Sequence, residues 1–118
     1  MMPNMTSFEF GDVVLVPFPF TDLEGSKKRP TVVVSSNAYQ IHRPDVLLLA
    51  ITSRVRSTLA FGEAVIGQWK KAGLLKPSTL KPVIFTVEQH RVLRSLGKLG
   101  TEDRQILRSI LNQIMGEV

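Results

Sequence analysis

The chain has 118 residues, of which 43% are hydrophobic, so it is long enough and apolar enough to fold as one globular domain. It has no cysteine, which excludes disulfides and thiol chemistry and agrees with a cytoplasmic location, and its longest apolar run, Val46 to Ile51, is too short to cross a membrane. Its net charge of +5 favours a polyanionic partner such as nucleic acid.

The first half of the chain has the pattern of strands joined by polar loops. We expect residues 1–7 to form a flexible N-terminus and residues 8–118 to form the single domain. Residues 12–18 are rich in Val and Leu and predict a first strand, and the β-branched residues 31–35 predict a second. Residues 37–45 are polar and are interrupted by a proline, which indicates a loop.

Three further strands are predicted in the middle of the chain. Residues 46–52 form a near-continuous apolar run, which predicts a strand buried on both faces. A basic, hydroxyl-rich loop follows over residues 53–58, and residues 59–66 predict a fourth strand with Gly62 at a bulge. The next stretch is irregular because Gly and Pro punctuate it, and residues 83–87 predict the fifth strand.

The C-terminal segment changes to helical spacing. Thr101 is the predicted cap, Glu102 and Asp103 lie in the first turn where the helix dipole favours acids, and Gly116 is the predicted stop. The apolar residues of this segment form one stripe, made of Ile106, Leu107, Ile110, Leu111, Ile114 and Met115. Five short strands and one amphipathic helix predict a mostly β fold, a small antiparallel barrel on which the helix lies.

The loop between the first two predicted strands carries the candidate chemistry. Glu24 lies at its middle, the cations Lys27, Lys28 and Arg29 lie at its exit, and Pro30 fixes the chain as it enters the second strand. A guanidinium is planar and always charged and can hold two phosphate oxygens at once. The pattern therefore favours a site that holds a phosphate.

Several short motifs follow one another along the chain. They are Gly11-Asp12-Val13-Val14, Gly25-Ser26 followed by Arg29-Pro30, Ile51-Thr52-Ser53, Leu75-Lys76-Pro77-Ser78 and Gly97-Lys98-Leu99-Gly100. In their order and spacing they resemble the motifs of the MazF/PemK family of toxin endoribonucleases. The resemblance implies an SH3-like barrel with a C-terminal helix, a homodimer, and cleavage of single-stranded RNA, including mRNA, without metal or cofactor. It also implies a cognate antitoxin that inhibits the dimer and through which alone operator DNA is bound.

The resemblance and the chemistry together suggest roles for individual residues. Such cleavage uses the 2′-hydroxyl of the RNA as nucleophile and leaves a 2′,3′-cyclic phosphate and a 5′-hydroxyl. Arg29 would stabilise the charge on the phosphate, the Thr52 hydroxyl would donate to a phosphate oxygen, and Glu24 is the candidate general base. The residues expected to bind substrate are Phe20, Lys27, Lys28, Ser53, Arg54, Arg56 and Lys81.

The chain departs from the family pattern at two places. Lys27 and Lys28 stand where many members have an acid or Gln, and Lys81-Pro82 stands where members often have a polar pair for RNA contacts. An acid role for His90 is left open, and two histidines without cysteine argue against a transition-metal site. Two other functions are also left open: a CcdB-like toxin that binds DNA gyrase without catalysis, and an SH3-like module that binds nucleic acid or peptides.

Overall fold

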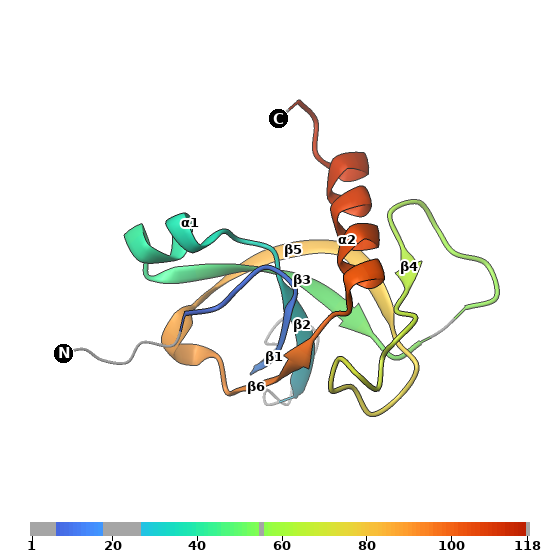
Figure 1. Cartoon of the computed structure of the whole chain (residues 1–118), viewed down its shortest axis with the longest axis horizontal. Coiled ribbons are helices and arrows are strands. Elements are labelled where there is room, and N and C mark those ends of the chain that lie inside the picture. The colour runs from blue at the N-terminus through green and yellow to red at the C-terminus, as the bar shows by residue number, and fades with distance from the viewer. Residues whose placement is uncertain (1–6, 18–26, 55, 118) are drawn as a thin grey trace.

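Six antiparallel strands form one strongly curled sheet with the order β4-β5-β3-β2-β1-β6 (Figure 1). The structure is a computed structural model, and it describes residues 7–17, 27–54 and 56–117. The strands are β1 Asp12–Pro17, β2 Lys28–Val33, β3 Asp45–Thr52, β4 Ala64–Val65, β5 Thr79–Glu88 and β6 Arg94–Lys98. Since β4 and β6 are the two edges of this sheet, it forms a half-barrel, and the predicted mostly β fold with a C-terminal helix is confirmed.

The central strands bury side chains on both faces of the sheet. Val13 and Leu49 belong to one core cluster, whereas their neighbours Val14 and Leu48 belong to a second cluster on the other face. All four side chains are fully buried. Burying a Val or Leu side chain contributes about 1.5–3 kcal/mol, so each of the two clusters stabilises the fold. The prediction that residues 46–52 are buried on both faces is therefore confirmed.

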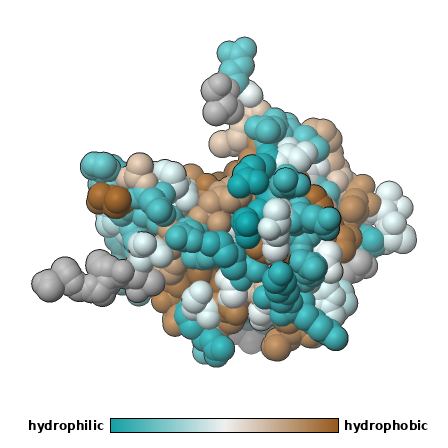
Figure 2. All heavy atoms as spheres, viewed as in Figure 1, coloured by the Kyte–Doolittle hydropathy of each residue, from teal (hydrophilic) through white to brown (hydrophobic). Residues whose placement is uncertain are grey.

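The C-terminal helix α2, Thr101–Ile114, covers the first of these clusters (Figure 1). Leu107 and Ile110 are buried in the cluster, but Ile106 and Met115 are 38% and 47% exposed, so the helix buries only part of its predicted stripe. Figure 2 shows that hydrophilic side chains cover much of the face of the molecule on which α2 lies. The predicted cap is wrong by one position, because Gly100 is the N-cap and Thr101 is the first helical residue.

A short helix occupies most of the segment that the sequence predicts as a loop. Helix α1 spans Asn37–His42, and the Ser36 hydroxyl caps it by accepting a hydrogen bond from the backbone N–H of Tyr39 at 3.1 Å. The Gln40 side chain is buried, and its amide donates a hydrogen bond to the backbone carbonyl of Phe8. The serine cap is a signal in the sequence, but the helix has too few apolar residues to show a helical period.

The boundaries of three other elements also differ from the prediction. Strand β4 is only two residues long, because Gly62, at φ +82°, lies in a turn closed by a hydrogen bond from Glu63 N–H to the Ala60 carbonyl rather than in a bulge. Strand β2 begins at Lys28 and therefore includes Arg29. Strand β5 begins at Thr79, ahead of the predicted start, and continues to Glu88, where the 3-10 helix η1, Gln89–Arg91, follows.

Strand β6 was not predicted, because its sequence is polar and contains a glycine. That glycine, Gly97, lets the irregular segment after β4 lie directly against the strand, since a Cβ there would meet the carbonyl oxygen of Ala72 at 2.5 Å. On the other side of the contact, Gly73 has φ +86° and a Cβ would collide with the backbone of Leu96. The two glycines therefore let this irregular segment lie directly against β6, and Gly73 of the segment and Leu96 of the strand both line the candidate site.

Candidate functional site

Arg29 lies within a strand, paired on one side with Val16 of β1. Its backbone is therefore fixed by the sheet, and its side chain is partly buried. It lines a cavity of about 470 Å³, which we call the large cavity. Four cationic residues line it, and no acid is among the described residues that do so; the four are Lys28, Arg29, Lys76 and Arg94.

The walls of the large cavity combine these cations with apolar and hydroxyl groups. Ile51, Leu74, Leu75 and Leu96 give it an apolar wall, and Leu75 is 92% exposed at its rim. Ser78 lines the same cavity, and its hydroxyl donates to the carbonyl of Lys76 at 2.8 Å. A cavity with cations, hydroxyls and an apolar wall suits an anionic ligand that also carries a flat apolar group, such as a nucleotide.

Thr52 is the last residue of β3, and it lines a different, smaller cavity of about 110 Å³. Ile51 and Ser53 on either side of it line the large cavity, because successive side chains of a strand point to opposite faces. The Thr52 hydroxyl accepts the backbone N–H of Arg54 at 3.1 Å, so its proton remains available to a ligand. The small cavity is lined by Thr52, Arg54, Arg56, Leu59, Glu63, Thr79 and Lys81.

Arg29 and Thr52 lie at corresponding positions on adjacent strands. The β2–β3 ladder ends at the pair Thr31 and Ala50, and two further residues along each strand are Arg29 and Thr52. The end of β3 therefore separates the two cavities, with the arginine lining one and the threonine lining the other. That both residues serve one reaction stays a prediction.

Lys81 reaches the small cavity but is engaged in an ion pair. Its ammonium lies 3.1 Å from the carboxylate of Glu63, and that side chain is only 7% exposed. The backbone N–H of Ala60 and the Lys81 ammonium hold the pKa of Glu63 below its usual range. Glu63 is therefore ionised at neutral pH and is a poor proton acceptor there.

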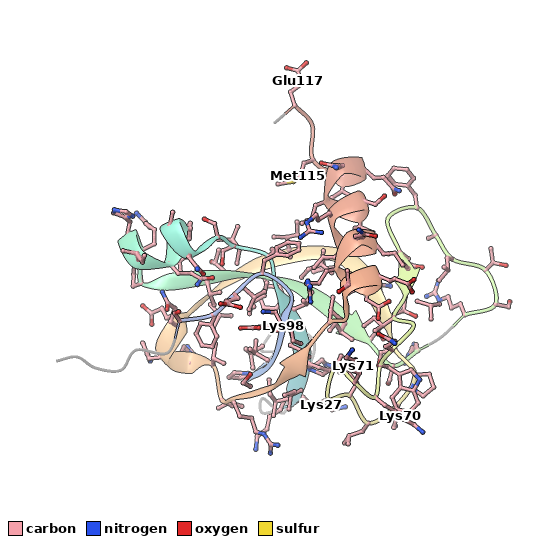
Figure 3. All side chains as sticks on the ribbon, in the orientation of Figure 1. Lys27, Lys70, Lys71, Lys98, Met115 and Glu117 are labelled. Atoms are coloured by element: carbon pink, nitrogen blue, oxygen red, sulfur yellow. The ribbon has the colours of Figure 1, made fainter. Side chains whose placement is uncertain are left out.

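The other predicted site residues differ in where they lie. Phe20 and Glu24 lie outside the described residues, so their predicted roles stay predictions. Lys27, Lys28, Ser53, Arg54 and Arg56 are exposed. Figure 3 shows Lys27 at the same end of the view as Lys70 and Lys71, far from the α2 terminus marked by Met115 and Glu117.

His90 lines neither the large nor the small cavity. It is exposed, and its ring nitrogen lies 2.9 Å from the Glu88 carboxylate.

The prediction missed five residues that line the cavities. They are Lys76, Ser78 and Arg94 in the large cavity and Glu63 and Thr79 in the small one. The first two belong to the Leu75-Lys76-Pro77-Ser78 motif, which was a usable signal. The other three come together only through strand pairing, which residue types alone do not reveal.

No group of three or more His, Asp or Glu side chains in the described part of the chain is placed to hold a metal ion. Within the same residues, no helix is both long and apolar enough to span a membrane.

Comparison with known proteins decides the family. A model of the PemK-like and MazF-like toxins of type II toxin–antitoxin systems matches residues 9–115. The chain belongs to this family. The motifs from Gly11 to Gly100 that suggested the resemblance all lie within the matched residues, so the expected MazF/PemK membership is confirmed. No curated protein sequence matches the chain.

Solved MazF-like structures share the fold at low sequence identity. The MazE–MazF complex (Form-III) from Deinococcus radiodurans superposes with a TM-score of 0.73 at 19% identity, covering 96% of this chain and 100% of that one. A mycobacterial endoribonuclease in complex with its cognate antitoxin gives 0.70 at 18% identity, with 87% and 89% covered. The toxin MazF-mt6 from Mycobacterium tuberculosis gives 0.67 at 20% identity, with 86% and 94% covered. The curled half-barrel with its C-terminal helix is therefore the MazF fold.

Proposed function

We propose that this MazF-like toxin is an endoribonuclease that cleaves single-stranded RNA, including mRNA, in the large cavity. The observation that carries the proposal is the cavity around Arg29, where four cations and no described acid line a space with one apolar wall. Single-stranded RNA offers both matching groups, an anionic backbone and unstacked bases. Proteins of this fold have been solved as endoribonucleases, which further supports the proposal.

The proposed reaction needs no group beyond the RNA and the protein. The 2′-hydroxyl oxygen attacks the adjacent phosphorus, the bond from phosphorus to the 5′-oxygen breaks, and the products are a 2′,3′-cyclic phosphate and a 5′-hydroxyl. The 2′-hydroxyl gives its proton to a base, for which Glu24 is the candidate, and the leaving 5′-oxygen takes up a proton from solvent water. Arg29 would stabilise the charge that builds on the phosphate oxygens, with the Thr52 hydroxyl as a second donor.

The partners of the toxin are proposed on the same basis. We infer that a cognate antitoxin binds and inhibits it, because two related toxins were solved in complex with their antitoxins. Contact with operator DNA would then occur only through that antitoxin. A homodimer and a cytoplasmic location are parts of the same proposal.

The test is RNA cleavage in EDTA by wild type and by Arg29→Ala, with end-group analysis of the products. Loss of the fixed guanidinium should slow cleavage about 100-fold or more, and the wild-type products should carry cyclic phosphate and 5′-hydroxyl ends. Arg43→Ala is the matched control, because Arg43 is an exposed arginine that pairs with Asp45 at 3.8 Å and lines neither cavity. If RNA of varied sequence stays intact, the proposal fails, and gyrase binding becomes the function to test.

A further inference from the structure

Beyond its first two residues, β5 is itself an edge of the sheet. The strand is ten residues long, but β4 pairs only with Thr79 and Leu80, and β5 continues well past it (Figure 1). The turn at Gly62 then lies beside Pro82, since a Cβ on that glycine would come within 3.1 Å of the Pro82 side chain. In the described part of the chain, no strand pairs with the outer side of residues 83–88, which we call the β5 edge.

Every second residue of the β5 edge points its backbone N–H and C=O away from β3. The N–H of Gln89 donates to the carbonyl of Pro44 at 2.9 Å, which makes these two a hydrogen-bonded pair next to the β3–β5 ladder. Such pairs alternate in an antiparallel ladder, so Val87 and Phe85 also bond to β3 and the residues between them face outward. The outward residues are Ile84, Thr86 and Glu88. No backbone hydrogen bond among the described residues engages their outward groups.

An open strand edge of this kind is matched by another extended polypeptide. The outward residues repeat about every 6.4–6.8 Å, and a second strand offers N–H and C=O groups at the same spacing. Many proteins bind peptides by adding a strand to a sheet in this way. Proline and lysine often block such addition, and β5 has both at positions 81 and 82 but neither over residues 83–88. The β5 edge is therefore the stretch that stays open to a partner strand.

A third cavity, which we call the edge cavity, adjoins the β5 edge. Its volume is about 280 Å³, and it is lined by Pro17, Asp45, Phe85, Thr86, Val87, Glu88 and Arg91. Four of these are consecutive residues of β5, so an added strand would run beside the cavity. Pro17, Phe85 and Val87 give it an apolar surface, and every second side chain of an added strand would face the same side of the sheet. The edge cavity shares no lining residue with the large or the small cavity.

The charged residues of the edge cavity favour an acid in the partner. Asp45 accepts a hydrogen bond from the Tyr39 hydroxyl at 2.6 Å, and the Glu88 carboxylate lies 2.9 Å from a ring nitrogen of His90. Both carboxylates are therefore engaged within the chain. Arg91 is exposed and has no carboxylate within ion-pairing distance in the described part of the chain. Its guanidinium is available to a carboxylate of the partner.

We propose that the β5 edge binds an extended segment of a partner protein as an added strand, with an apolar side chain in the edge cavity and an acidic side chain beside Arg91. The segment pairs with the outward N–H and C=O groups of Ile84, Thr86 and Glu88. This inference goes beyond the proposed RNA cleavage and does not depend on it, because none of the residues expected to bind or cut RNA lines the edge cavity.

The probe is a peptide selected on the wild-type protein from a displayed library of random peptides of strand length. The selected peptides should alternate apolar and polar residues and carry an acid. Thr86→Pro removes one outward N–H, a change that edge strands tolerate, and it should weaken peptide binding by about tenfold or more. Thr86→Val keeps the N–H and is the matched control, with a Kd within about twofold of wild type. Arg91→Gln should weaken binding about threefold, as expected for an exposed ion pair.

Two further measurements on the wild-type protein decide between strand addition and docking of side chains alone. Methylating the backbone nitrogen of every second peptide residue should abolish binding in one register and leave the Kd unchanged in the other. Amide hydrogen exchange measured by NMR should slow at Ile84, Thr86 and Glu88 when the peptide binds. The amides of Phe85 and Val87 already bond to β3 and should change little. These measurements decide the question even if Thr86→Pro does not fold.

Several outcomes would overturn the inference or part of it. Failure to select a peptide, or unchanged exchange at the three outward amides, would overturn strand addition, as would equal peptide binding by wild type and a folded Thr86→Pro. Protection of these amides without peptide, rising with protein concentration, would show that a second copy of this chain occupies the edge and that the proposed partner is wrong. Wild-type affinity of Arg91→Gln would overturn only the acidic contact. No measurement includes RNA, so the proposed cleavage is tested separately.

Discussion

At the scale of single residues, Arg29 lies in an environment different from the one that the sequence suggests. The sequence places it at the exit of a polar loop, whereas the structure places it in β2, where it pairs with Val16 of the neighbouring strand. Strand pairing fixes the backbone of Arg29 and partial burial restricts its side chain, so the guanidinium loses less freedom on binding a phosphate than one on a mobile loop would. Pro30 lies in the same strand and pairs with Leu15.

Glu63 gives a prediction about pH at the same scale. Its pKa lies below the usual range because Ala60 N–H and Lys81 stabilise the carboxylate in the folded state. The ionised group therefore stabilises the fold above its unfolded pKa, and this contribution is lost as the pH falls from about 4.5 through the lowered folded-state pKa. We expect Glu63→Gln to lower the melting temperature at pH 7 and to approach wild type as the pH falls below 4, measured by thermal unfolding at a series of pH values.

Glu9→Gln is the control for this prediction. The pKa of Glu9 is also lowered, through its hydrogen bond and ion pair with Lys98, but this pair lies away from both cavities. Both variants should lose the same kind of acid dependence, and only Glu63→Gln should also change RNA affinity by freeing Lys81. A melting-temperature difference for Glu63→Gln that stays constant from pH 7 to pH 3 would contradict the assignment.

At the scale of elements, the N-terminus of α2 joins the helix to the wall of the site. Asp103 is 4% exposed, and its two carboxylate oxygens accept the backbone N–H groups of Gly67 and Gln68, each at 2.9 Å. Those two residues open the irregular segment that later contributes Gly73 and Leu74 to the large cavity. Asp103 therefore stabilises the position of that segment as well as the first turn of the helix.

We expect Asp103→Ala to destabilise the protein by about 2–4 kcal/mol, because two partly buried N–H groups lose their acceptor. Urea denaturation monitored by the fluorescence of Trp69 gives the free energy of unfolding. The control is Glu102→Ala in the same helical turn, which is exposed and should change stability by less than about 0.5 kcal/mol. Equal effects of the two substitutions would show that Asp103 acts only through the helix dipole.

The accuracy of the sequence prediction also differs from element to element. Strands β1 and β3 were predicted well because burial on both faces requires continuous β-branched and aliphatic residues. Strand β6 and helix α1 were missed because they are polar, and pairing with β1 or the packing of Gln40 stabilises them instead. The predicted site contains Arg29 and Thr52 because each belongs to a motif. Thr79 and Glu63 were not predicted, because they come to line the small cavity only through the pairing of β5 with its neighbours.

At the scale of the whole molecule, the net charge of +5 is partly concentrated at the two cavities. Seven Lys or Arg residues line them against Glu63 as the single acid among the described lining residues. Elsewhere, cations such as Lys98 lie beside acids, and the ammonium of Lys98 is paired with Glu9. The field of the molecule should therefore guide an anionic strand to the end of β3 where the two cavities meet.

The last prediction concerns the salt dependence of RNA binding. If four to six of these cations contact phosphates, the logarithm of the association constant should fall with the logarithm of salt concentration with a slope of about −3 to −4. Arg94→Gln removes one cation from the large cavity and should reduce the slope by about 0.7, while Lys98→Gln should leave it unchanged because that ammonium is paired with Glu9. Fluorescence anisotropy with a single-stranded RNA whose 2′-O-methyl groups prevent cleavage gives the slopes at several salt concentrations. A wild-type slope shallower than about −1 would mean that these cations do not contact the RNA backbone. The two cavities would then have to bind an uncharged partner.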